Sequence, residues 1–158
     1  MMRKIGVIGI GNPLRSDDGI GVLLLDKLIE RKKEFSQYIT FIDGGTGGLG
    51  LLPLLSRFTT LVFVDAVDFG GKVAESKLLR FEDMKSMKTC ITSTTHESDM
   101  LHVLLFSKQL NMSADEIFFY GIQPKDTSSG TTLSYELQKK FDFILHDLIR
   151  CIKNVERG

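Results

Sequence analysis

Acidic side chains and a histidine stand at three separated points of the chain where they could share one metal ion. Asp17 and Asp18 form a pair after a glycine-rich turn, and Asp65 ends the most hydrophobic run of the sequence. His96 lies in a Thr-Thr-His-Glu string that fits a capping box, which predicts the first turn of a helix. There the helix dipole disfavours the imidazolium and leaves a neutral ring that can bind metal. Two carboxylates and one imidazole favour an open transition-metal site with oxygen and nitrogen ligands.

Each of these residues also has a plainer interpretation. Asp17 and Asp18 could both complement a helix dipole, although the pair is better explained if one acid caps the helix and the other points into a crevice. Asp65 could close a turn with Asp68, and His96 could hydrogen-bond a loop. A carboxylate with no function at the end of a buried strand would cost desolvation energy. The position of Asp65 therefore favours the shared metal site.

A glycine pattern near the start of the chain is similar to a nucleotide-binding loop but departs from it. Gly9-Ile-Gly11 follows a strand-like run, whereas Leu14 occupies the position of the third glycine in a dinucleotide fingerprint. The helix that follows begins at Asp17 and Asp18, whose carboxylates repel phosphate. A nucleotide-binding α/β module is therefore the less favoured alternative.

An ordinary zinc peptidase is another alternative. His96-Glu97 begins an HExxH string, but Met100 occupies the position of the second histidine. Cys90 and Cys151 form no CxxC pair, so they supply neither a disulfide framework nor a cysteine-based zinc site. We therefore expect no tightly held metal in the resting protein.

Alternating strand-like and helix-like runs are expected to position these residues. Apolar runs rich in β-branched or aromatic residues predict strands at residues 4–9, 38–43, 60–65, 77–81 and 116–122. Apolar residues at helical spacing predict helices at residues 18–33, 49–56, 97–110 and 133–152, the first of them capped by Asp17. This order is typical of a three-layer α/β sandwich, a mostly parallel sheet of about five strands with helices on both faces. Such sheets bind ligands at the carboxyl ends of their strands, where Asp18, Asp65 and His96 should emerge.

The composition is that of a globular domain. The chain has 158 residues, 42% of them hydrophobic, and we expect one domain over residues 1–158. Lys and Arg number 20, as do Asp and Glu, so no net charge attracts nucleic acid or an anionic membrane surface. The longest stretch without a charge, residues 44–56, is shorter than the roughly 18 residues of a membrane span. With no evident secretory segment, we expect a cytoplasmic protein.

Five motifs together resemble those of the hydrogenase maturation endopeptidases. In the family's order and approximate spacing they are the run from Gly9 through Asn12 and Asp17-Asp18 to Gly21, Asp43-Gly-Gly-Thr46, Val64-Asp65-Ala66, Thr94-Thr-His96 and Gly121-Ile-Gln-Pro124. The last two are most similar to the branch that serves formate-hydrogenlyase-type hydrogenases. The resemblance spans most of the chain.

The resemblance implies a function and a set of site residues. The family removes a C-terminal extension from the large-subunit precursor of nickel-iron hydrogenase after nickel has been inserted. Asp18, Asp65 and His96 match the family's metal-binding positions, so they are expected to serve catalysis and metal recognition together. Asp18 is one methylene shorter than the glutamate of some members. The expected supporting residues are Asn12, Asp17 and Asp43.

The nickel is expected to arrive with the substrate. An open three-ligand site is poorly suited to structural metal but suited to contacting an ion that a partner already holds. Nickel held in this way would place the scissile bond near Asp18 and Asp65, where proximity supplies much of the rate. The ion could also polarise a carbonyl or a water as a Lewis acid. A nickel-binding maturation chaperone that does not cut would use the same ligands and is the main alternative.

Overall fold

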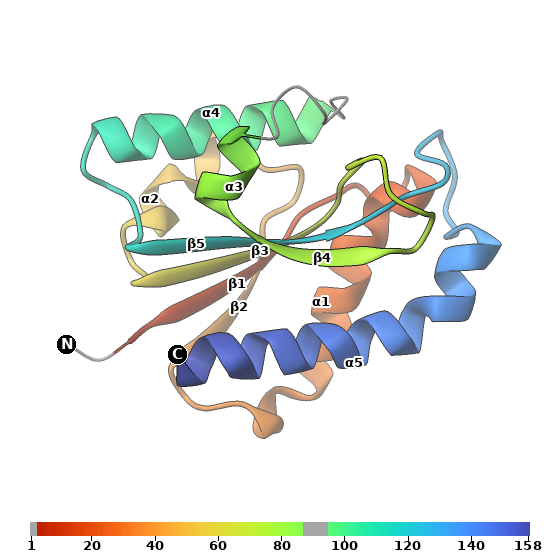
Figure 1. The fold of residues 1–158 in the computed structure, drawn as a ribbon, viewed down its shortest axis with the longest axis horizontal. Helices are drawn as coiled ribbons and strands as arrows, with labels where there is room; N and C mark the ends of the chain where they lie inside the picture. Colours follow the sequence, from red (N-terminus) through yellow and green to blue (C-terminus); the bar gives the residue numbers. More distant parts are fainter. Residues whose placement is uncertain (1–2, 87–94) are drawn as a thin grey trace.

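A five-stranded sheet forms the middle layer of the molecule (Figure 1). A computed structural model describes residues 3–86 and 95–158, and the side chains at 84–86, 95–99 and 101 are outside that description. The strands, in the spatial order β2-β1-β3-β5-β4, are β1 (Ile5–Gly9), β2 (Ile39–Asp43), β3 (Thr60–Ala66), β4 (Ser76–Arg80) and β5 (Glu116–Ile122). All neighbouring pairs are parallel except β4 with β5, which is antiparallel.

Helices cover both faces of the sheet, which confirms the predicted three-layer sandwich (Figure 1). One face carries α1 (Ile20–Glu30) and α5 (Tyr135–Arg157), and the other carries α2 (Leu52–Leu55), α3 (Phe81–Ser86) and α4 (Thr95–Gln109). Three short 3-10 turns interrupt the connections, at η1 (Ser16–Gly19), η2 (Lys32–Glu34) and η3 (Leu49–Leu51). Within the described residues, no helix is long and apolar enough to cross a membrane.

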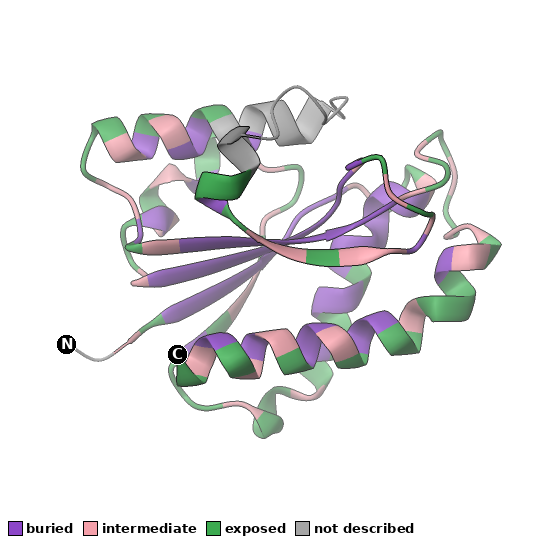
Figure 2. Cartoon of the chain, in the orientation of Figure 1, coloured by how far each residue is buried: buried purple, intermediate pink, exposed green. Residues whose placement is uncertain are grey.

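The hydrophobic patterns of the sequence correspond closely to these elements. β1 and β3 are buried along their whole length, whereas the edge strands β2 and β4 are partly exposed (Figure 2). The apolar stripe of the last helix is buried at Leu137, Ile144 and Leu148, as its helical spacing predicts. Two features were not predicted: the antiparallel direction of β4 and the separate helix α3.

Alternate residues of each central strand pack into different cores on the two faces of the sheet. Val7 and Val62 belong to the core beneath α1 and α5, whereas Ile8 and Phe63 belong to the core beneath α2 and α4. Phe63 stacks on Phe119 of β5 with ring centroids 5.1 Å apart. The central strands are therefore rigid supports for whatever follows their carboxyl ends.

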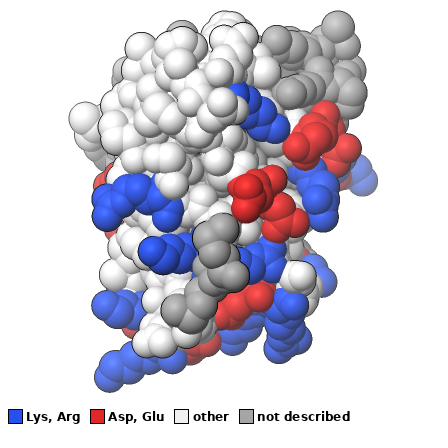
Figure 3. All heavy atoms as spheres, turned by 90° about the vertical axis from the view of Figure 1, so that its left-hand side faces the viewer, with Lys and Arg blue, Asp and Glu red and all other residues white. Residues whose placement is uncertain are grey.

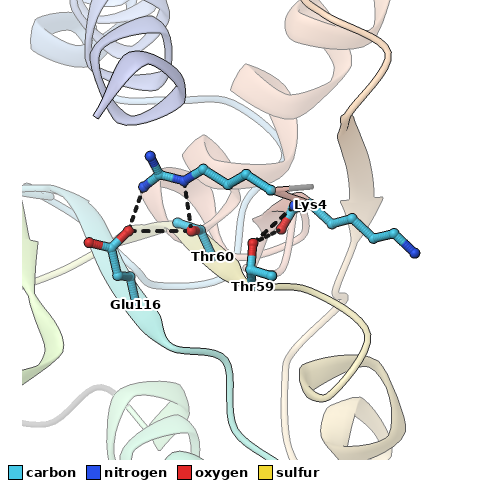
Figure 4. A network of polar contacts seen from close by, with 5 residues as sticks. Lys4, Thr59, Thr60 and Glu116 are labelled. Atoms are coloured by element: carbon cyan, nitrogen blue, oxygen red, sulfur yellow. Dashed lines mark hydrogen bonds and ion pairs between the residues drawn. The ribbon is translucent and has the colours of Figure 1, made fainter. Parts of the chain in front are cut away.

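Polar contacts join the strands at the opposite, amino-terminal edge of the sheet. Arg3 pairs with Glu116, and its Nε donates to Thr60 Oγ1 at 3.2 Å. The backbone N–H of Lys4 donates to Thr59 Oγ1 at 2.9 Å (Figure 4). Basic and acidic side chains also lie side by side on this face of the molecule (Figure 3). These groups tie the starts of β1, β3 and β5 together.

Candidate functional site

The strand order changes direction next to β1, which makes this part of the sheet a topological switch point. From β1 the chain crosses to β2 on one side and then to β3 on the other. Gly9, the last residue of β1, pairs with Val64, and the N–H of Ile10 donates to Val64 O at 2.9 Å. Ligands of open α/β sheets bind at such a switch point. Asp18 follows β1, and Asp65 directly follows Val64 in β3.

Asp18 is held at this switch point by the loop that precedes it. Its side chain belongs to η1, which packs against β3, and the residue is only 2% exposed. The backbone N–H of Asn12 donates to Asp18 Oδ2 at 2.9 Å. Gly11 has a φ of +144°, and a Cβ built there would lie 1.9 Å from the carbonyl oxygen of Asp18. Only glycine lets the loop approach the turn this closely.

Asp65 is buried on the neighbouring strand. It is 5% exposed and lies one residue before the end of β3, opposite Gly121 of β5. Because η1 packs against β3, the structure brings together the two elements that carry Asp18 and Asp65. Two acidic residues that are 47 positions apart thus lie at one edge of the sheet, within the core of the fold.

The backbone of His96 lies in the first turn of α4, where the sequence predicts it. Its side chain, and the predicted capping contacts of Thr94 and Glu97, lie outside the described residues. The next turn of α4 is anchored over the loop after β2, because a Cβ at Gly47 would lie 2.8 Å from the sulfur of buried Met100.

Coordination of one ion by Asp18, Asp65 and His96 stays a prediction. Among the side chains that the structure describes, no group of three or more His, Cys, Asp or Glu residues could hold a metal ion. Because the imidazole of His96 is not among them, that observation concerns only the two acids of the predicted set. Cys90 also lies outside the described residues, so the observation does not concern its thiol.

Asp17 does not cap the first helix, contrary to the prediction. Within the described residues, η1 and α1 have no side-chain capping bond, and α1 begins only at Ile20. The carboxylate of Asp17 instead accepts backbone N–H groups from Lys125, Asp126 and Ser134, at 2.9, 3.0 and 2.7 Å. A pattern in the local sequence cannot reveal this role, because its donors come from a segment more than a hundred residues away.

Asp43, another expected supporting residue, shapes the neighbouring loop. It is exposed at the end of β2 and accepts the backbone N–H of Gly45 at 2.8 Å. The N–H of Gly44 in turn donates to the carbonyl of Gly9 at 2.8 Å. Asp43 therefore lies at the same edge of the sheet as Asp18.

Gln123 holds a loop at this edge of the sheet, a role that the sequence did not predict. Its Oε1 accepts N–H groups from Phe69 and Gly71 at 3.0 and 3.1 Å, and its Nε2 donates to Asp68 Oδ1 at 3.0 Å. This buried amide holds the loop that follows β3. Its only signal in the sequence is a glutamine directly after a buried strand, within the Gly-Ile-Gln-Pro motif.

The glycine-rich turn after β1 has no arrangement for phosphate. The N–H of Gly11 donates to Gly45 O at 2.8 Å, and the N–H of Asn12 donates to the carboxylate of Asp18. A phosphate-binding loop presents such N–H groups to its ligand. Here internal acceptors use them, one of which is an acid, so the geometry disfavours the nucleotide-binding alternative.

Comparison with known proteins identifies relatives over most of the chain. A family model for hydrogenase maturation proteases matches residues 23–151. The hydrogenase expression/formation protein HupD of Rhodobacter capsulatus is 27% identical over 148 residues, which cover 93% of this chain and 70% of that protein. The hydrogenase 3 maturation protease of Escherichia coli K12 is 31% identical over 117 residues, which cover 73% of this chain and 69% of that protein. Other relatives are longer, and the match spans 64% of HupD from Bradyrhizobium diazoefficiens.

Solved structures share the fold at low sequence identity. The hydrogenase-maturating endopeptidase HybD of Escherichia coli superposes with a TM-score of 0.81 at 22% identity, over 96% of this chain and 93% of that one. HybD of Thermococcus kodakarensis gives a TM-score of 0.77 at 22% identity, over 94% and 98% of the two chains.

Proposed function

This chain belongs to the hydrogenase maturation protease family and is thus a hydrolase of the peptidase class; from that premise we propose that it cuts the C-terminal extension from a nickel-iron hydrogenase large-subunit precursor once nickel has been inserted. The nickel is part of the substrate and serves as its recognition mark. The chain's Thr94-Thr-His96 and Gly121-Ile-Gln-Pro124 motifs favour the branch that serves formate-hydrogenlyase-type hydrogenases. We further propose that residues 1–158 act as one domain in the cytoplasm.

The observation that carries this proposal is the pair of buried acids at the switch point. Asp18 and Asp65 come from two elements that pack together, and each is almost fully removed from solvent. Carboxylate oxygens from η1 and β3, together with the imidazole at the start of α4, would suit an ion that the precursor presents.

In this proposal the chain's own residues orient the tail and the partner supplies the metal. Asp18, Asp65 and His96 contact the nickel, which fixes the register of the precursor's tail against the carboxyl edge of the sheet. The scissile bond is thereby held near the two acids, and proximity lowers the barrier to hydrolysis. The nickel, when present, also supplies Lewis-acid polarisation of a carbonyl or a water.

The decisive experiment uses the purified protein and a nickel-loaded large-subunit precursor. We expect the precursor to lose a C-terminal fragment, which intact-mass measurement detects together with the cleavage position. A nickel-binding chaperone would bind the same precursor without any change in its mass. Binding without cleavage would therefore overturn the peptidase proposal in favour of that alternative.

A further inference from the structure

A long irregular loop after β5 lies against the turn that carries Asp18. The loop covers residues 123–134, between β5 and α5, at the same end of the sheet as the start of α1 (Figure 1). Arg15 and Gly130 form an isolated parallel bridge. The N–H of Ser16 donates to Gly130 O, and the N–H of Gly130 donates to Leu14 O, both at 2.9 Å. The loop and the turn are thus joined like two short strands.

The carboxylate of Asp17 is the centre of this junction. Asp17 is 0% exposed, and its Oδ2 accepts the N–H groups of Lys125 and Asp126 while its Oδ1 accepts that of Ser134. The backbone N–H of Asp17 also donates to Asp126 O at 2.9 Å. Charge-assisted bonds to backbone N–H groups are stronger than neutral ones. One side chain therefore fastens both ends of the loop to the turn.

The turn itself is strained and depends on this loop. Ser16 has a φ of +52°, a conformation that L-residues other than glycine rarely adopt. Its hydroxyl donates to Ser128 O at 2.9 Å, and Arg15 Nε donates to Thr127 O at 3.1 Å. A strained residue persists only where its surroundings over-determine its conformation. Release of the loop should therefore let the turn relax.

We propose that Asp17 is a positioning residue of the site: by fastening residues 125–134 to the turn, it fixes the backbone that places Asp18 at the switch point. The inference rests on the proposed role of Asp18 in the reaction. The two neighbouring acids divide the work, because Asp17 binds the distant loop while Asp18 accepts the N–H of Asn12. Asp17 acts through Asp18 and does not itself touch the substrate.

The first test weakens the hydrogen bonds between the Asp17 carboxylate and the loop. Asp17→Asn keeps the shape of the side chain but replaces one acceptor oxygen with a donor NH₂, so it cannot accept all three N–H groups. We expect faster hydrogen exchange at Lys125, Asp126 and Ser134. The amide proton of Asn12 reports the bond to Asp18 Oδ2, and its chemical shift should move. Because small misplacements at a site are costly, kcat/KM for precursor cleavage should fall by about 100-fold.

The second test weakens the same junction from the loop. Ser134 has a φ of −56°, which lies within the range of proline, and Ser134→Pro deletes the N–H that donates to Asp17. Ser134→Ala is the matched control, because the buried Ser134 hydroxyl makes no hydrogen bond within the described residues. We expect the proline variant to shift the Asn12 amide and lower kcat/KM, and the alanine variant to do neither. If Asp17→Asn does not fold, this pair of variants decides the question.

A double variant separates positioning from a general loss of stability. If Asp17 acts through Asp18, then Asp17→Asn should lower kcat/KM no further in an Asp18→Asn background, measured in single turnover. Full additivity of the two losses would overturn the inference. So would an unchanged Asn12 shift in a folded Asp17→Asn variant. If the wild-type protein cuts no precursor, the proposed function fails, while the Asn12 amide still decides whether Asp17 positions Asp18.

Discussion

At the scale of single residues, neighbouring acids have different partners and therefore different consequences when they are changed. Asp17 is committed to three backbone N–H groups of a distant loop, whereas Asp18 and Asp65 are buried beside the switch point of the sheet. Removal of a residue that serves function often leaves stability unchanged or raises it. This difference separates the residues that support the site from those that we propose to do its chemistry.

Asp65→Ala and His96→Ala should abolish processing of the precursor. We expect at least a 100-fold loss of kcat/KM, because each change deletes one proposed contact to the substrate's nickel. The melting temperature should change little, as measured by circular dichroism. Asp115→Ala and His146→Ala are matched controls, since both side chains are exposed and lie on other parts of the molecule. Normal processing by either site variant, or its unfolding, would contradict the assigned roles.

At the scale of elements, the approach of the β1 loop to η1 depends on glycine. Gly11→Ala should destabilise the protein by at least about 2 kcal/mol, because the new methyl would overlap the carbonyl of Asp18 at an unfavourable φ. Gly50→Ala is the control: its Cβ would meet no atom within 4 Å, and the expected change is within about 0.5 kcal/mol. Urea denaturation measures both values, and equal stabilities would disprove the argument.

The attachment of α5 to the sheet should depend on pH. The hydroxyl of Tyr120 in β5 lies 2.7 Å from Asp147 Oδ2 on α5, and Arg150 pairs with the same carboxylate. Burial opposes ionisation of Asp147, but the hydrogen bonds from Arg150 and Tyr120 outweigh it and hold the pKa of that carboxyl below its usual value. Because the folded pKa is the lower one, the stabilisation is complete above the unfolded pKa, about 3.9, and is lost as the pH falls through the folded value.

Asp147→Asn should therefore be less stable than the wild type at pH 7, by about 1 kcal/mol, the usual net contribution of one hydrogen bond. The difference between the two proteins should stay constant down to about pH 4 and shrink below it. Denaturation curves at several pH values test this expectation. Asp142→Asn, at an exposed position of the same helix, is the control. A difference that persists at low pH would show that the ion pair is not its cause.

At the scale of the whole molecule, the carboxyl edge of the sheet is a meeting point of four loops. Gln123 holds the loop after β3, Asp17 holds the loop after β5, and Gly44 joins the loop after β2 to β1. Each connection uses backbone groups of one loop and a residue of another. The site is thus a product of the entire sheet, although its proposed ligands come from only a few positions.

Cleavage should depend on nickel in the precursor and not on a metal that this protein keeps. The proposed ligand set of two acids and one imidazole is open, and such a set holds metal weakly without a further ligand from the substrate. Elemental analysis of the purified protein should find far less than one metal ion per chain. Nickel-free precursor should stay uncut under conditions in which the loaded form is processed. Stoichiometric metal together with equal cleavage of both forms would instead indicate a conventional metallopeptidase.

The sequence by itself determined most of the helices and strands, and the edge of the sheet at which Asp18 and Asp65 lie. Apolar residues that alternate with polar ones indicate a strand, and apolar residues at helical spacing indicate a helix. This holds because apolar side chains collect on the buried face of each element. The strand over residues 116–122 and the short helix around Pro53 follow from such local patterns and are confirmed. Parallel strands joined by helices must collect their following loops at one edge, which predicted where Asp18, Asp65 and the start of α4 would emerge.

Only the tertiary structure decided which groups hold that edge together. The prediction that Asp17 caps a helix was wrong, and the sequence did not predict the bridging role of Gln123. The antiparallel pairing of β4 has no signal in its local sequence. In the first two cases the partners are backbone N–H groups of distant segments. Every residue except proline carries the same N–H, so the sequence contains no mark of which one will donate to which side chain. That choice is made when the sheet brings loops far apart in the chain into contact.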